Sequence, residues 1–490
     1  MSTLANNTNP LWWKDPGIRK LNFLLLTSYL GATGDGYVNS LISSLIANPR
    51  YLSDIKGLLD TRVLGLVVAS HSLGCIAGFL PAPWVSERYG RRAGILVGNI
   101  GRLAGFTGQI FCRTFEQFLA MRMLVGFSSM FNTISSSALL VELAHPRQRA
   151  VAGALFNTCY FLGAAIAAWT SYESLKIQSA WSWKLPVAVQ LFWSVAQLTF
   201  CAFCPESLSW LVRHGKEEKA KAIMVHYHAN GREDDELVCS EMARMSAAVN
   251  EARQTTVTGW RALVSTPGNR RRLVLSMVIA VSTQWVGNGI ISYYLAPVLR
   301  TVGITNSFRQ QSINGSLQIY NWLLAICAAL LCEKAGRRRL FLTSTSTMLL
   351  FMVLVTICSA LYSTTGSASA GYAVIVFLFL FLGGYVIGLT PIPILYVNEI
   401  WPSHLRTKGT SVFWVTQAVA VCFNQFVNPV ALSKIAWRYY LVYVGVLVAV
   451  MNFIFFYVPE TKGLSREQVG DMFDRPRRHS IELVDVRPES

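Results

Sequence analysis

Twelve stretches of this sequence are long and apolar enough to cross a lipid bilayer as helices. A spanning helix needs about 20 mainly apolar residues, and its backbone polar groups must bond to one another because the bilayer core holds no water. The stretches are 21–46, 63–84, 93–112, 116–141, 150–170, 185–204, 273–299, 312–332, 340–362, 371–398, 409–431 and 438–458. The sequence therefore predicts an all-α membrane protein.

The composition and charge of the chain agree with that prediction. Of the 490 residues, 52% are hydrophobic and only 14% are charged, whereas soluble domains carry roughly 25% charge. This excludes a disordered chain and argues against a soluble multidomain enzyme. The formal net charge of +17 follows from the concentration of Lys and Arg in cytoplasmic loops. The bilayer is therefore the expected partner, and nucleic acid is not.

The spans divide into two groups of six around a long polar segment. The predicted segments are a cytoplasmic N-terminus (1–20), a first six-helix bundle (21–204), a cytoplasmic central loop (205–272), a second six-helix bundle (273–458) and a cytoplasmic tail (459–490). Within the central loop, EEKAKAIMVHYH (217–228) has the pattern of an amphipathic helix. Basic residues in the tails and the central loop predict that both termini are cytoplasmic.

Two local sequences recur at matching places in the two groups. ERYGRR (87–92) lies between spans two and three, and EKAGRR (333–338) lies between spans eight and nine. ELAHPRQR (142–149) follows span four, and EIWPSHLR (399–406) follows span ten. Both elements recur in the same order, as expected for the duplicated halves of a transporter.

The repeated residues are suited to a gate at the cytoplasmic rim. An arginine fork can bind a carboxylate through two parallel hydrogen bonds. The alternative is that these arginines only keep the loops in the cytoplasm. The candidate gate residues are Glu87, Arg88, Arg91, Arg92, Glu142, Arg149, Glu206, Glu333, Arg337, Arg338, Glu399, Arg406 and Glu460.

Further motifs accompany these repeats. Span seven contains QWVGNGIISYY (284–294), and the central loop contains YHANG (227–231). PES (205–207) and PETKG (459–463) follow the two groups of spans. Together, the motifs and repeats resemble the sugar-porter branch of the major facilitator superfamily, and within it the fungal lactose-permease-type transporters.

The resemblance implies the major facilitator fold, with twelve transmembrane helices in two pseudo-symmetric six-helix bundles. It also implies a monomeric plasma-membrane protein that moves a disaccharide or a hexose by alternating access and proton symport. No cofactor and no enzymatic reaction are expected. Cys201 and Cys204 form a CxxC pair with no second pair nearby, so no metal site is predicted either.

The chain also departs from the family pattern. Glu87 and Glu333 replace the usual Asp of the two loops, which keeps the charge. PESPRWL has become PESLSWL (205–211), with the loss of one arginine. The acidic and tryptophan positions of many hexose carriers align with Val386 and Ile394. Two polar sugar contacts are thereby removed, which argues against a simple hexose.

Charged residues inside the spans are functional candidates because a charge at the bilayer centre is costly unless it is paired or hydrated. In the family that this chain resembles, an Asp in span one and an Arg in span four couple proton movement to sugar binding. Asp35 and Arg122 stand at these two positions. We expect these two residues to form an ion pair that takes part in proton coupling. The alternative is a static ion pair that only holds the two spans together. Arg102 is expected to extend to a surface, and His71 is a secondary titrating candidate.

Sugar hydroxyls require hydrogen-bond partners and an aromatic surface that face a central cavity. Following the family's positions, the substrate candidates are Asn157, Thr283, Gln284, Asn288, Asn321 and Asn424. Trp414 and Gln417, one helical turn apart in span eleven, could add an aromatic surface and an amide. For each residue alone, the alternative is an interhelical hydrogen bond. Together they favour a polar, uncharged ligand.

Two other functions stay open at the sequence level. The first is a carrier or exporter of a non-sugar polyol, a quinate-like acid or a secondary metabolite, which Val386 and Ile394 favour over a glucose carrier. The second is a non-transporting nutrient sensor, although such sensors tend to have longer cytoplasmic tails. ATP-driven transport has no P-loop in the central loop to support it.

Overall fold

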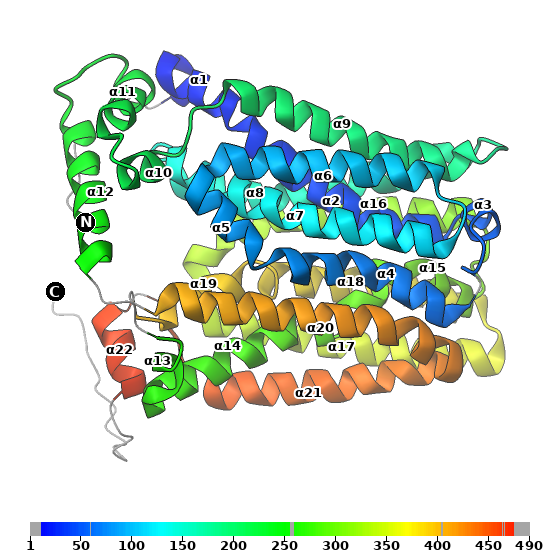
Figure 1. Ribbon diagram of the computed structural model, residues 1–490. Coiled ribbons are helices and arrows are strands. Elements are labelled where there is room, and N and C mark those ends of the chain that lie inside the picture. Colours follow the sequence, from blue (N-terminus) through cyan, green and yellow to red (C-terminus); the bar gives the residue numbers. More distant parts are fainter. Residues whose placement is uncertain are drawn as a thin grey trace, which may run out of the picture.

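The computed structural model describes residues 11–58, 60–254, 259–402, 405–462, 464 and 466–474. Long helices lie side by side along one axis (Figure 1). Helices α10 to α13 and α22 gather at one end of the molecule, which we call the linker end, and α3 lies at the opposite end, which we call the far end. The outermost parts of the predicted terminal segments, 1–10 and 475–490, lie outside the described residues.

The helices of the first half are α1 (Pro16–Leu24), α2 (Leu26–Ile46), α3 (Pro49–Asp54), α4 (Thr61–Gly78), α5 (Pro81–Tyr89), α6 (Arg91–Phe111), α7 (Phe115–Leu143), α8 (Arg149–Ser174) and α9 (Trp181–Phe203). The linker contains α10 (Leu208–Arg213), α11 (Glu217–His228), α12 (Glu236–Gln254) and α13 (Ala262–Ser265). The second half contains α14 (Pro267–Trp285), α15 (Asn288–Thr301), α16 (Ser307–Ala335), α17 (Arg337–Thr365), α18 (Ala368–Gly388), α19 (Ile392–Ile400), α20 (Arg406–Ile435), α21 (Tyr439–Tyr457) and the terminal α22 (Arg466–Asp474).

Each of the twelve predicted spans falls on one of these helices or on two consecutive ones. Four spans are interrupted, between α1 and α2, α4 and α5, α14 and α15, and α18 and α19. Pro81 and Pro391 stand at two of the breaks, where the missing N–H interrupts the helical hydrogen bonds. At the third, Gly287 has a φ of +98°, a left-handed conformation that glycine adopts without strain.

Eight of the described stretches meet the length and hydropathy expected of a membrane span. Helices α2, α6 and α16 are not among them, and polar residues are distributed along α2 and α6. Asp35 and Thr33 lie on α2, and Asn99, Arg102 and Gln109 lie on α6. Their polarity points to a functional interior in the first half.

The two halves pack against each other through three helix pairs. Helix α8 lies against α16, α4 against α20, and α2 against α15. The linker helices α10 to α12 instead attach to the first half, and α13 packs against α14 of the second half. Asn230 after α11 donates two hydrogen bonds of 3.1 Å to Asp15, and His228 Nε2 lies 3.0 Å from the Leu143 carbonyl oxygen at the end of α7.

Candidate functional site

The repeated sequence between α5 and α6 builds a cluster of charges at the linker end of the first half. Arg91 reaches both carboxylate oxygens of Glu142, with N···O distances of 3.1 and 3.2 Å. Glu206 accepts hydrogen bonds from the backbone N–H groups of Arg91 and Arg92, at 2.9 and 3.3 Å. Ser207 completes the cluster by donating to Glu142.

The second half contains the same cluster one repeat later. Arg337 contacts Glu399 at 2.8 Å. Glu460 accepts from the backbone N–H groups of Arg337 and Arg338, at 2.8 and 3.1 Å, and Thr461 donates to Glu399 at 2.5 Å. The sequence repeat is therefore also a structural repeat of arginine, carboxylate and hydroxyl.

The second carboxylate in each cluster binds backbone amides as an anion. Burial alone would raise the pKa of Glu460, but hydrogen bonds from four backbone N–H groups hold this pKa below its usual value. The glycine before each arginine pair permits the contact. Gly336 has a φ of +86°, and a Cβ atom there would lie 2.9 Å from a Glu460 oxygen.

Five further gate candidates lie outside the two clusters. Glu87 and Arg88 are exposed, and the Arg88 guanidinium lies over the ring of Trp84. Arg149 lies 3.7 Å from Glu241 of α12, and Arg406 lines a recess together with Arg337 and Glu399. The side chain of Glu333 lies outside the described residues.

The central carboxylate has a different partner from the one that we expected. Asp35 Oδ1 is 3.0 Å from Arg102 Nη1, a charge contact that is not aligned as a hydrogen bond. Thr133 of α7 donates to Asp35 Oδ2 at 2.7 Å. Arg102 is only 1% exposed, so the expectation that it extends to a surface is wrong. The close approach depends on Gly34, because a Cβ there would lie 3.2 Å from Arg102 Nη2.

Arg122 is buried on α7, with 4% exposure, and it does not pair with Asp35. No ion pair or hydrogen bond joins Arg122 to any described residue. Its electrostatic neighbours include the hydroxyl groups of Tyr51, Tyr293 and Tyr294. The expected pairing of Asp35 with Arg122 is therefore replaced by one paired and one unpaired arginine.

Four of the substrate candidates meet around the break between α14 and α15. Thr283 Oγ1 accepts from Gln417 at 2.9 Å and from Gln284 at 3.3 Å. Asn424 donates to the Gln284 carbonyl at 2.7 Å, and Tyr385 donates to the Thr283 carbonyl at 3.0 Å. The break leaves these carbonyl groups without helical partners, and side chains of α18 and α20 bind them.

The other four substrate candidates are not joined to this group by any bond between described residues. Asn288 and Asn321 are buried, and each keeps a side-chain oxygen without a hydrogen-bond partner. Asn157 is exposed on α8, and Trp414 is 44% exposed on α20. Asn288 and Asn321 thus keep acceptors for a ligand, whereas Asn157 and Trp414 have accessible side chains.

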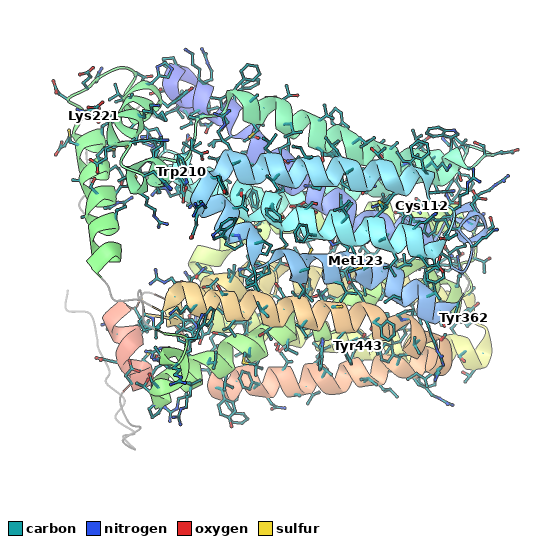
Figure 2. All side chains as sticks on the ribbon, in the orientation of Figure 1. Cys112, Met123, Trp210, Lys221, Tyr362 and Tyr443 are labelled. Carbon is teal, nitrogen blue, oxygen red and sulfur yellow. The ribbon has the colours of Figure 1, made fainter. Side chains whose placement is uncertain are left out.

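The sequence did not predict several of the buried polar contacts. Gln197 bonds to Asn99 at 3.1 Å and to Ser136 at 2.9 Å, and Ser136 donates to Asn132 at 3.1 Å. In the second half, Tyr443, which is labelled in Figure 2, donates to Asn428 of α20 at 2.6 Å. The signal for these contacts is the presence of amide side chains in apolar spans, at positions that the family resemblance does not mark.

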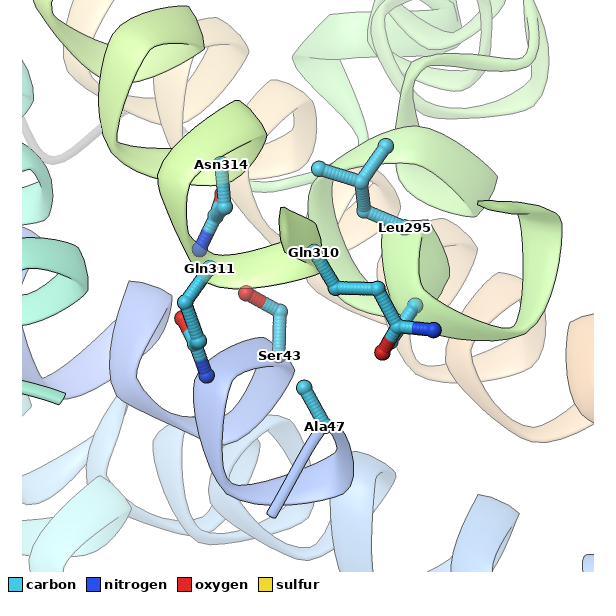
Figure 3. Close-up of a pocket in the computed structure, with 7 residues that line it drawn as sticks. Ser43, Ala47, Leu295, Gln310, Gln311 and Asn314 are labelled. Carbon is cyan, nitrogen blue, oxygen red and sulfur yellow. The ribbon is translucent and has the colours of Figure 1, made fainter. Parts of the chain in front are cut away.

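The two halves are joined by hydrogen bonds at the far end. Gln311 of α16 donates to the Ser44 carbonyl at 2.7 Å, and Asn314 donates to the Ser44 hydroxyl at 3.2 Å. Figure 3 shows Gln311 and Asn314 beside Ser43 of α2 and Ala47, the residue that follows this helix. Nearer the middle, Ser72 of α4 donates to Gln425 of α20 at 2.6 Å. The contacts close the far end, whereas each charge cluster stays within its own half.

The chain matches the sequence profile described as "Sugar (and other) transporter" over residues 26–473. It belongs to that family. The family consists of transporters rather than enzymes, and its members here include distant fungal relatives. An MFS-type transporter of Aspergillus oryzae, oryC, is 27% identical over 89% of this chain and 82% of its own length. Hexose transporter 2 of Kluyveromyces lactis is 26% identical over 86% of this chain and 75% of its own length.

Solved structures show the same fold. The proton:xylose symporter XylE bound to 6-bromo-6-deoxy-D-glucose superimposes with a TM-score of 0.75, at 19% identity, over 92% of this chain and 99% of that one. The inward open conformation of XylE from E. coli gives a TM-score of 0.76 at 18% identity, with the same coverage. The major facilitator fold predicted from the sequence is therefore confirmed.

Proposed function

We propose that this transporter moves a hydroxyl-rich, sugar-sized solute across the membrane by proton symport. The observation that carries the proposal is Asp35, a carboxylate in the middle of α2 that contacts α6 through Arg102 and α7 through Thr133. A buried ion pair depends on the charge of both partners. Protonation of Asp35 would release Arg102, and movement of α2 against α6 would follow.

The solute would bind where the broken helix exposes polar groups. Carbonyl groups and amides near the α14–α15 break offer both donors and acceptors, which is how discontinuous helices form sites near the bilayer midplane. Asn288 and Asn321 add two side-chain oxygens. Similar proteins support this solute class, since one is a hexose transporter and another a proton:xylose symporter, and the second also supports the coupling ion.

Alternating access would use the two ends of the molecule differently. The amide contacts between Gln311, Asn314 and Ser44 would open when the far end opens. At the linker end, the arginines of the two clusters would exchange partners when the halves close. We assign the linker end to the cytoplasm, so both termini are cytoplasmic, and we propose a monomer in the plasma membrane of a fungal cell with a specificity near the lactose-permease type.

Uptake into proteoliposomes tests the proposal. Labelled lactose, cellobiose, D-glucose and D-xylose would be offered with and without an inward proton gradient, to the natural chain and to Asp35→Asn. We expect a gradient to drive accumulation by the natural chain, whereas Asp35→Asn should exchange solute without accumulating it. Equal gradient-driven accumulation by both proteins would remove Asp35 from the coupling mechanism, and a protein that moves no solute in any assay would fit a sensor instead.

A further inference from the structure

The charges well inside the long helices do not balance. In the described membrane helices, the charged residues away from the helix ends are Asp35, Arg102 and Arg122. Asp35 is in contact with Arg102, and one positive charge therefore remains. Exchange of partners during transport would not alter this sum, because whichever arginine leaves Asp35 is then the unpaired one. An uncompensated charge in this position costs several kcal/mol.

Several buried polar groups around the unpaired charge also lack hydrogen-bond partners. Arg122 Nε, the Tyr51 hydroxyl and His71 Nε2 are all enclosed without a hydrogen-bond partner. Helix α4 brings His71 and Cys75 within electrostatic range of both arginines. Arg102 adds its own Nε and Nη2, which are likewise enclosed and unsatisfied. Buried polar groups in native proteins nearly always have partners, so this region calls for a group that accepts hydrogen bonds and carries negative charge.

The position of Arg122 is one where a transported solute could supply that group. Arg122 belongs to the first half, and its neighbours Tyr293 and Tyr294 belong to α15 of the second half. Tyr294 donates to the Gln425 carbonyl, and the Gln425 side chain accepts from Ser72 across the two halves. The cation therefore lies at the interface between the halves, next to the contacts that must change in alternating access.

We infer that the transported solute is a hydroxylated carboxylic acid in its anionic form, such as a sugar acid, whose carboxylate binds Arg122. The guanidinium fork matches a carboxylate in geometry and charge. The hydroxyl groups of the same solute would bind the amides near the α14–α15 break. Val386 and Ile394, which are apolar where hexose carriers have polar contacts, agree with a ligand other than a neutral hexose. The inference rests on the proposed transport function and names its substrate class.

The test compares solutes that differ mainly in the charge of one group. Labelled D-glucuronate and D-gluconate would be compared with D-glucose and D-sorbitol in proteoliposomes, using the natural chain, Arg122→Gln and Arg122→Lys. Arg113→Gln is the matched control, because it removes one positive charge from an exposed site at the far end. We expect the natural chain and the control to prefer the acids by roughly tenfold, as for one charge-assisted hydrogen-bonded pair. Arg122→Gln should lose this preference, and Arg122→Lys should retain part of it.

Thermal unfolding separates lost binding from lost folding. D-glucuronate should raise the melting temperature of the natural chain but not that of Arg122→Gln, which should fold because it removes an unpaired buried charge. If the natural chain transports D-glucose or D-sorbitol but neither acid, and Arg122→Gln transports the same compounds equally well, the inference is overturned and the proposed transport function stands. Transport of none of the four compounds, without stabilisation by any of them, would overturn both.

Discussion

At the residue scale, the two buried arginines differ in what they do for stability. Arg102 compensates Asp35, so Arg102→Gln leaves a carboxylate of 13% side-chain exposure without its cation. Removing one partner of a buried pair costs about 3–5 kcal/mol. We therefore expect Arg102→Gln to lower the melting temperature of the detergent-solubilised protein clearly.

The double variant Asp35→Asn/Arg102→Gln is the control for this prediction. It removes both charges together, so most of the lost stability should return. A double variant as unstable as Arg102→Gln would mean that packing of the long side chain, against Phe106 for example, rather than charge, is what matters.

Sequence alone named the charged residues but not their pairing. The pairing of Asp35 with Arg122 was predicted from the family resemblance. The observed partner of Asp35 is Arg102, and this contact depends on how α6 is rotated about its axis. Successive residues of a helix point in directions about 100° apart. The apolar length of a span locates the helix in the sequence but does not determine how the helix is rotated about its axis. Gly34 is the local feature that brings Arg102 close, and a glycine has several possible purposes in a membrane helix.

At the element scale, the turns between α5 and α6 and between α16 and α17 depend on one glycine each. Gly90 has a φ of +105°, and a Cβ there would lie 2.4 Å from a Glu206 oxygen. Gly90→Ala should therefore strain the backbone and break the hydrogen bonds of Glu206 to Arg91 and Arg92. The backbone strain alone should lower the free energy of unfolding by about 1–3 kcal/mol. Thermal unfolding measures the loss, and Gly336→Ala should behave alike.

A third glycine supplies the matched control for that prediction. Gly153 lies inside α8, and a Cβ there would meet no atom within 4 Å. Because alanine favours helices over glycine by roughly 1 kcal/mol, Gly153→Ala should leave the protein as stable as before or more so. Equal tolerance of alanine at positions 90 and 153 would contradict the role assigned to the turn.

The attachment of α11 to the first half should weaken in acid. The rings of His145 and His228 have centroids 5.2 Å apart with their planes tilted by 58°, and the residues are 4% and 2% exposed. Burial lowers the pKa of each to about 4, from about 6.5 when free. The other charged groups acting on them are Asp15, Arg147, Arg149 and Asp235.

The sign of this effect follows from which state binds protons. Between pH 6.5 and 4 the detached histidines take up protons that the packed ones do not, so attachment is complete above about pH 6.5 and is lost progressively below it. The protection factors of 217–228 against hydrogen exchange, which correct for the intrinsic pH dependence of amide exchange, should fall from pH 7 to pH 5. His145→Gln/His228→Gln should remove that fall, and a persistent pH dependence of the protection factors in this variant would assign it to other groups.

Element positions could be predicted far better than contacts. All twelve spans fall on helices, and the predicted helix 217–228 coincides with α11, because apolar length and amphipathic period are local properties. The repeats also predicted pairing of arginine with carboxylate, but the structure was needed to show that Arg91 pairs with Glu142 and Arg337 with Glu399. The amides Asn99, Asn132 and Gln197 escaped prediction, since their network joins three helices that only the fold brings together.

At the scale of the whole molecule, the internal repeat produces two halves that carry the same charge cluster at the linker end and meet through uncharged hydrogen bonds at the far end. Each cluster lies at the linker end within one half, whereas the described hydrogen bonds between halves at the far end involve Ser44, Gln311 and Asn314. Amide contacts can be broken without separating charges, so a junction of this kind can open at modest cost. The far end is thus the part of the interface where opening can be tested directly.

A disulfide across this junction should stop transport. The Ser44 and Asn314 side chains are 3.2 Å apart across the two halves. Ser44→Cys/Asn314→Cys, introduced after the natural cysteines have been replaced by serine, should lose uptake on mild oxidation and regain it on reduction.

The side chains of Asn48 and Ser182 are 3.3 Å apart at the same end but within the first half. Asn48→Cys/Ser182→Cys should form its disulfide and keep transporting, since alternating access moves one half against the other and leaves each intact. Loss of uptake in both pairs would mean that oxidation harms the fold itself, and unchanged uptake in the cross-linked Ser44–Asn314 pair would show that the far end does not open during transport.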